Sequence, residues 1–150
     1  MKTTQPGAIL IVEDDPNDVF LDKAVLASLA LLHPLHAVGN GEEMIAYLEG
    51  QGIYRERSAY PYPTLILLDL KMPGMDGFHA IQWLQSHPEH AVPFVILSTK
   101  GAWPWTGRAK EFGARNFLQK PIHAGDFLTM AKSLGLPLAY QDTPSALRSE

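Results

Sequence analysis

Cysteine is absent from this chain of 150 residues. The protein can therefore form no disulfide bond, thiolate zinc site or iron–sulfur cluster, and it has no thiol nucleophile. Long apolar runs are also lacking, because the stretches 65–68 and 94–97 are far shorter than the roughly 20 residues that span a bilayer. No basic start with an apolar block precedes a small-residue cleavage site, so nothing indicates secretion. We expect a cytoplasmic protein with no membrane attachment.

Basic residues are also fewer than acidic residues. Twelve Lys and Arg oppose 16 Asp and Glu, which leaves a net charge of −4 and no basic run. A phosphate backbone would meet a mildly repulsive surface, so we expect no direct nucleic-acid partner. The six histidines are scattered, and His87 and His90 lie in a proline-containing loop rather than on a helix, so we expect no histidine-bound metal. No glycine motif that would cradle a nucleotide phosphate is present.

Short apolar runs alternate with helical patterns along the chain. The predicted strands are Ala8–Val12, Leu35–Val38, Thr64–Asp69, Pro93–Thr99 and Asn116–Leu118. The predicted helical stretches begin at Pro16, cover Glu42–Leu48, follow the turn-rich KMPGMDG, and cover Arg108–Phe112 and Asp126–Leu134. This alternation predicts an α/β fold with a five-stranded parallel sheet in the order 2-1-3-4-5, doubly wound by helices on both faces.

Asp15 and Pro16 suit the N-cap and the first position of a helix whose apolar stripe would include Val19 and Phe20.

Residues 49–63 form a long loop or helix extension of the kind that is often functional. We expect one domain over 1–134, followed by a tail over 135–150 that is either disordered or docked on a partner, with no second domain.

Acidic residues end two strands that should be neighbours. Glu13 and Asp14 follow the first strand, and Asp69 ends the third. In a doubly wound sheet, ligands bind beyond the carboxyl ends of the strands where strand order reverses, so these carboxylates should converge. Like charges held close together repel unless they share a cation, and a set of oxygen ligands selects a hard ion such as Mg²⁺. We therefore expect a magnesium site at this sheet edge.

The other two strand ends supply groups for a phosphoryl ligand. Ser98 and Thr99 end the fourth strand with hydroxyl groups, and Lys120 ends the fifth with an ammonium group. A phosphoryl group in transfer carries charge on three oxygens, and a metal, a hydroxyl and a lysine can each stabilise one of them. Asp69 then remains as the nucleophile, because a carboxylate can form an acyl phosphate.

At this point the residues resemble a known family, the response regulator receiver domains. The matching motifs are ILIVEDD at the first strand, LILLDLKMPGMDG around Asp69, a hydroxyl after the fourth strand, and Lys120 followed by Pro121 after the fifth. The resemblance extends over about 8–134. Their order and spacing make the match specific.

The resemblance implies a role for each of these residues. Asp69 would be the phosphoacceptor. Asp14 would bind Mg²⁺ directly, Glu13 would act as a second acid, and the backbone carbonyl of Lys71 would be a third ligand. The other implied roles are Ser98 as switch hydroxyl, Thr99 as its neighbour near the access route, Phe117 as switch aromatic, Lys120 as phosphoryl-binding cation, and a cis peptide at Lys120-Pro121.

The resemblance also implies a mechanism and a partner. A sensor histidine kinase would pass the phosphoryl group from its phosphohistidine to Asp69, and the receiver would catalyse its own modification. Phosphorylation would then shift an equilibrium between two surface arrangements of helix four, strand five and helix five.

Two departures from the family pattern point to a subfamily. GAWPWTG falls where helix four would begin, so this helix should be short or irregular, and Trp103 and Trp105 are either core anchors or interface residues. The long loop 49–63 is similar to that of stand-alone regulators serving phytochrome-type kinases. Self-association through helix four, strand five and helix five, or through the tail as an arm, would be consistent with this type.

Three other functions remain open at this stage. An aspartyl-phosphate phosphatase would use a similar nucleophile, but a second Asp should follow two residues later, where this chain has Lys71. A flavodoxin-like FMN carrier should have a phosphate-binding loop after its first strand, where this chain has three acids. A receiver-like domain that works only by contact, without phosphorylation, is the third.

Overall fold

A parallel sheet organises the molecule, whose computed structural model describes residues 6–69, 77–98 and 116–141. The sheet order is β2-β1-β3-β4-β5. Its strands are β1 (Ala8–Val12), β2 (Leu35–Val38), β3 (Pro63–Asp69), β4 (Phe94–Ser98) and β5 (Asn116–Gln119). The helices are α1 (Pro16–Ala27), α2 (Gly41–Glu49), α3 (Gly77–Ser86) and α5 (Ala124–Leu134), with 3₁₀ turns η1 (Gly52–Arg55) and η2 (Pro88–His90). The predicted fold class and strand order are confirmed.

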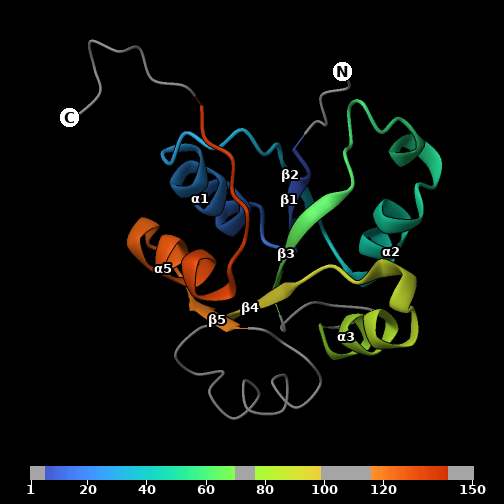
Figure 1. Ribbon diagram of the computed structural model, residues 1–150. Coiled ribbons are helices and arrows are strands. Elements are labelled where there is room, and N and C mark those ends of the chain that lie inside the picture. Colours follow the sequence, from blue (N-terminus) through green and yellow to red (C-terminus); the bar gives the residue numbers. More distant parts are fainter. Residues whose placement is uncertain (1–5, 70–76, 99–115, 142–150) are drawn as a thin grey trace.

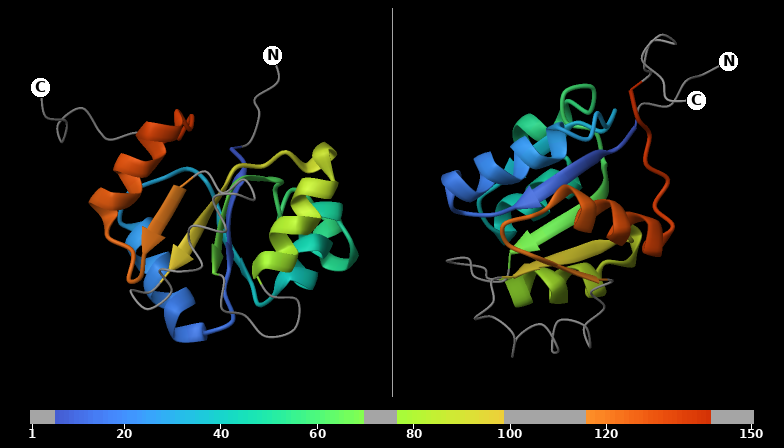
Figure 2. Two further views of the ribbon diagram at one scale, coloured as in Figure 1. Left: turned by 90° about the horizontal axis from the view of Figure 1, so that it is seen from below. Right: turned by 90° about the vertical axis from the view of Figure 1, so that its left-hand side faces the viewer.

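Helices cover both faces of the sheet and divide the core in two. Figures 1 and 2 show α1 and α5 on one face and α2 and α3 on the other. In β1, Leu10 and Val12 belong to the cluster under α2 and α3, whereas Ile9 and Ile11 belong to the cluster under α1 and α5. Burial of both faces explains the uninterrupted apolar runs of the central strands.

Helix α1 begins as predicted, but it buries a different face. The Asp15 carboxylate accepts hydrogen bonds from the backbone N–H groups of Asn17 and Asp18, and Pro16 follows it directly. Phe20, predicted to pack inward, is 72% exposed, so that prediction was wrong. Asp22 and Leu26, four residues apart, are the buried positions instead. The helix carries apolar side chains around most of its circumference, so periodicity could not select the buried face.

The long segment after α2 is folded against the domain rather than left open. Arg57 holds it by donating hydrogen bonds to the backbone carbonyls of Leu48 and Tyr60 and by lying over the ring of Tyr47. The ring of Tyr54 packs 4.9 Å from that of Tyr47, centroid to centroid. Gly50, with φ of 66°, supplies the left-handed residue that ends α2 and turns the chain into this segment.

The chain after α5 packs against the same domain as far as the structure describes it. Leu136 and Leu138 contact the cluster under α1 and α5. The backbone N–H of Leu32 donates to the carbonyl of Ala139, and a single antiparallel bridge joins Leu31 to Tyr140. Residues 135–141 therefore lie against the domain, whereas 142–150 lie outside the described residues. The division into 1–134 and 135–150 stays a prediction.

Several other predictions also fall outside the described residues. They concern the strand end at Thr99, the helix over Arg108–Phe112, the environment of Trp103 and Trp105, and the backbone carbonyl of Lys71. Among the described helices, none has both the length and the apolar character that a bilayer crossing requires.

The buried hydroxyl of Tyr47 gives a test of how the long segment is held. It donates a 2.8 Å hydrogen bond to the carbonyl of Pro61. Tyr47→Phe leaves that carbonyl without its donor, so we expect it to lower the free energy of unfolding by about 1–3 kcal/mol in urea titrations. Tyr140→Phe is the control, because Tyr140 is exposed, and should change stability by less than about 0.5 kcal/mol. Equal stability of both variants would contradict this account.

Candidate functional site

Three carboxylates converge at the carboxyl edge of the sheet. Glu13 and Asp14 directly follow β1, and Asp69 is the last residue of β3. The two strands are neighbours in register, with Val12 opposite Leu68. One oxygen from each carboxylate lies within 4.8 Å of the others. The predicted convergence of Glu13, Asp14 and Asp69 is therefore present in the structure.

Lys120 closes the site from the end of β5. Its Nζ lies 2.6 Å from Glu13 Oε1, 2.9 Å from Asp18 Oδ2 and 3.0 Å from Asp69 Oδ2. The backbone N–H of Lys120 donates to the carbonyl of Ser98, which fixes the end of β5 against β4. The peptide bond before Pro121 is cis, as the family resemblance implied.

Burial and ion pairing set the electrostatics of this cluster. Burial raises the pKa of Glu13 to about 7, although the neighbouring ammonium of Lys120 opposes the shift. Burial alone would lower the pKa of Lys120, but its close contacts with the carboxylates of Glu13, Asp18 and Asp69 outweigh burial and hold the pKa above its ordinary value. Lys120 therefore stays charged among acids that repel one another.

The donor set fits a divalent cation. Glu13 Oε1 is buried and, among the described residues, has no hydrogen-bond partner in good geometry despite its close ion pair with Lys120. Asp14 is exposed, so its carboxylate opens the site to solvent. Oxygen-only ligands with an open side suit a hard ion that keeps several of its waters. Within the described residues no other group of three acids or histidines is placed to hold a metal.

The predicted switch residues lie at the ends of β4 and β5. Ser98 is half-buried as the last residue of β4, one position beyond Leu97, the partner of Asp69 in the sheet register. Phe117 lies opposite Ile96 and packs against the cluster under α2 and α3. Thr99 and Lys71, the remaining predicted site residues, lie outside the described part of the chain.

Sequence reasoning missed two acids on α1. Asp18 contacts Lys120, and Asp22, one turn later, is 2% exposed. Asp22 Oδ2 has no hydrogen-bond partner among the described residues, and burial raises the pKa of this side chain to about 6. Their spacing of four residues, directly after the acidic run that ends in Asp15, was the signal that could have revealed them.

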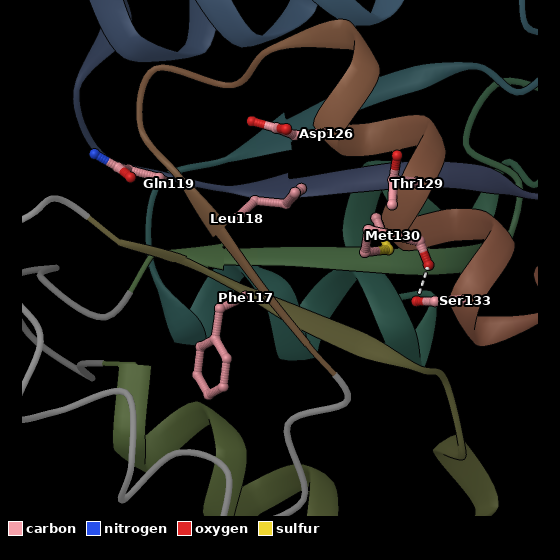
Figure 3. Close-up of a pocket in the computed structure, with 7 residues that line it drawn as sticks. All are labelled: Phe117, Leu118, Gln119, Asp126, Thr129, Met130 and Ser133. Carbon is pink, nitrogen blue, oxygen red and sulfur yellow. Dashed lines mark hydrogen bonds between the residues drawn. The ribbon is translucent and has the colours of Figure 1, made fainter.

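A pocket of about 400 Å³ lies away from the acids, beside β5 and α5. Figure 3 shows Leu118 and Met130 on the α5 side of β5, with the ring of Phe117 on the opposite side of the strand. Gln119, Asp126, Thr129 and Ser133 complete the lining. The structure therefore offers a hollow on the surface that contains the predicted switch aromatic.

The buried carboxylate of Asp22 predicts a pH-dependent stability. Its raised pKa means that the folded protein holds this proton more tightly than the unfolded chain does. That contribution favours folding at acid pH and is lost as pH rises from about 4 through about 6. In chelator, we expect Asp22→Asn to raise the free energy of unfolding at pH 7.5 by about 1–3 kcal/mol.

Urea titrations across pH check this expectation. The gain should shrink as pH falls below 6, where Asp22 is neutral in the folded protein. Asp126→Asn, at an exposed position in the first turn of α5, should show no such trend. A constant difference between Asp22→Asn and the unaltered protein at all pH values would contradict the assignment.

Comparisons with known proteins agree with the geometry. A model of the response regulator receiver domain matches residues 9–132. Response regulator Rcp1 of Synechocystis sp. is 34% identical over 134 residues, which cover 89% of each chain.

Solved structures give the same result. The bacteriophytochrome response regulator RtBRR has a TM-score of 0.79 and 28% identity, over 93% of this chain and 84% of that one. A Mn²⁺-bound form of Rcp1 has a TM-score of 0.69 and 29% identity, over 93% and 100%. Phosphorylated RcpA, a cyanobacterial phytochrome response regulator, has a TM-score of 0.69 and 28% identity, over 86% and 91%. This chain belongs to the response regulator receiver domain family.

Proposed function

We propose that this protein is a phosphoacceptor response regulator that takes a phosphoryl group from the phosphohistidine of a sensor kinase onto Asp69. The observation that carries the proposal is the buried carboxylate of Asp69, which accepts a 3.0 Å hydrogen bond from Lys120 and lies within 4.8 Å of Glu13 and Asp14. A Mn²⁺-bound relative and a phosphorylated relative support it.

The transfer is a single displacement at phosphorus. An Asp69 carboxylate oxygen forms the new P–O bond while the P–N bond to the kinase histidine breaks, and the bonding electrons leave with the imidazole. Lys120 donates to a phosphoryl oxygen, and Ser98, with Thr99 beside it, supplies a hydroxyl for another. The protein therefore acts as a signalling domain that catalyses its own phosphorylation and dephosphorylation rather than as a phosphatase.

Glu13, Asp14 and Asp69, with the backbone carbonyl of Lys71, would hold Mg²⁺. When bound, this ion offsets the negative charge that gathers as a phosphoryl group approaches the carboxylates. The burial of Glu13 and the short separation of the three carboxylates support a cation here, because like charges held this close together repel.

Output would be made by protein contact. Ser98 and Phe117 would move together on phosphorylation and change the surface of β5 and α5, where the pocket of Figure 3 lies. The similarity to RtBRR and RcpA supports a phytochrome-type kinase as the donor. A homodimer through helix four, β5 and α5, or through the tail as an arm, and a cytoplasmic location without direct nucleic-acid contact complete the proposal.

A small phosphoryl donor tests the central claim. With acetyl phosphate and Mg²⁺, we expect a base-labile mass gain of one phosphoryl group. Asp69→Asn should abolish the gain, because it removes the acceptor carboxylate. Excess chelator should reduce the gain to background, because it removes the cation. Asp126→Asn is the control and should be modified normally. No gain with either acetyl phosphate or the partner kinase would leave phosphorylation-independent contact as the function.

A further inference from the structure

The ammonium of Lys120 has more partners than a phosphoryl-binding lysine requires. Besides Glu13 and Asp69, it contacts Asp18 Oδ2 at 2.9 Å. Asp18 comes from the first turn of α1, not from a strand end, and its side chain is 37% exposed whereas that of Lys120 is 11% exposed. Asp18 therefore covers the solvent side of the ammonium.

The first turn of α1 is built so that Asp18 is fixed relative to Glu13. The backbone N–H of Asp15 donates to Glu13 Oε2. The Asp15 carboxylate in turn accepts from the backbone N–H of Asn17 at 2.8 Å and of Asp18 at 3.4 Å. Glu13, Asp15, Asp18 and Lys120 thus form a closed ring of polar contacts, which joins both anchors of the lysine through one short stretch of backbone.

An ammonium group has three N–H donors, and Nζ of Lys120 has three carboxylates within 3.0 Å. The contact with Asp69 Oδ2 is a hydrogen bond, and ion pairs with Glu13 and Asp18 flank the ammonium. Nζ therefore lies next to the place where the oxygens of a phosphoryl group on Asp69 would be. A lysine side chain is a flexible four-carbon stem, so an ammonium held in place beforehand saves reorganisation during transfer.

We propose that Asp18 is a positioning residue, which holds the Lys120 ammonium toward the phosphoacceptor so that it is in place when the phosphoryl group arrives. The proposal rests on the proposed function of Asp69. It also assigns a use to the acidic first turn of α1 beyond the capping by Asp15.

Phosphorylation kinetics test this role. At saturating Mg²⁺, we expect Asp18→Ala to slow phosphorylation by acetyl phosphate roughly tenfold. Asp18→Asn, which keeps an acceptor oxygen but loses the charge, should fall between Asp18→Ala and the unaltered protein. The melting temperature should hardly change, because a partly exposed ion pair contributes little to stability. Glu42→Ala is the matched control: it removes an acid from the first turn of α2, and its rate should be unaltered.

A double-mutant cycle shows whether the effect acts through Lys120. In a Lys120→Met background, Asp18→Ala should cause no further slowing. The same slowing in both backgrounds, an unchanged rate or a faster rate would each overturn the proposal. A faster rate would mean that Asp18 withholds the ammonium from the phosphoryl group.

A spectroscopic measurement on the unphosphorylated protein separates this proposal from the proposed function. With ¹⁵N-labelled lysine, the Nζ signal that disappears in Lys120→Met should be observable because three carboxylates protect the ammonium from exchange. Asp18→Ala should broaden or remove the signal, and Glu42→Ala should leave it intact. An unchanged signal in Asp18→Ala would overturn the positioning role even if Asp69 is phosphorylated. If the unaltered protein cannot be phosphorylated but the Nζ signal is still lost in Asp18→Ala, only the proposed function is refuted.

Discussion

The ion-pair cluster around Lys120 connects most of the elements that build the functional edge of this domain. One ammonium group lies within 3.0 Å of carboxylates from the end of β1, the first turn of α1 and the end of β3. Because Glu13 and Asp69 are buried, their charges are weakly screened, and both form ion pairs with the same lysine. A change in charge at Asp69 therefore alters the electrostatic interactions of Lys120 with β1 and α1 as well as with β3.

This arrangement holds several carboxylates close together, where their like charges repel one another. The acids Glu13, Asp14, Asp18, Asp22 and Asp69 lie at or near the edge, and burial pushes the pKa of Glu13 to about 7 and that of Asp22 to about 6. Such a cluster reduces folding stability near neutral pH, which is a common property of functional sites. A cation that relieves the repulsion would both stabilise the fold and complete the site.

The rest of the fold provides a rigid frame for this edge. The parallel register aligns Val12 with Leu68 and Asp69 with Leu97, so that the acidic side chains emerge at one level. Two separate apolar clusters fix the sheet from its two faces. The folded segment after α2 and the chain after α5 add packing at the periphery, away from the acids.

Local sequence determined the strands, the N-cap at Asp15, the strand order and the convergence of Glu13, Asp14, Asp69 and Lys120, because apolar runs that end in acids have few arrangements in a doubly wound sheet. Only the tertiary structure decided which face of α1 is buried, since Phe20 and Leu26 are equally apolar but only one of them faces α5 and the sheet. It likewise revealed Asp18 and Asp22 as part of the site and the packing of 136–141 on the domain. The buried face of α1 and the packing of 136–141 depend on contacts between distant segments, and such contacts leave no periodic signal in the sequence.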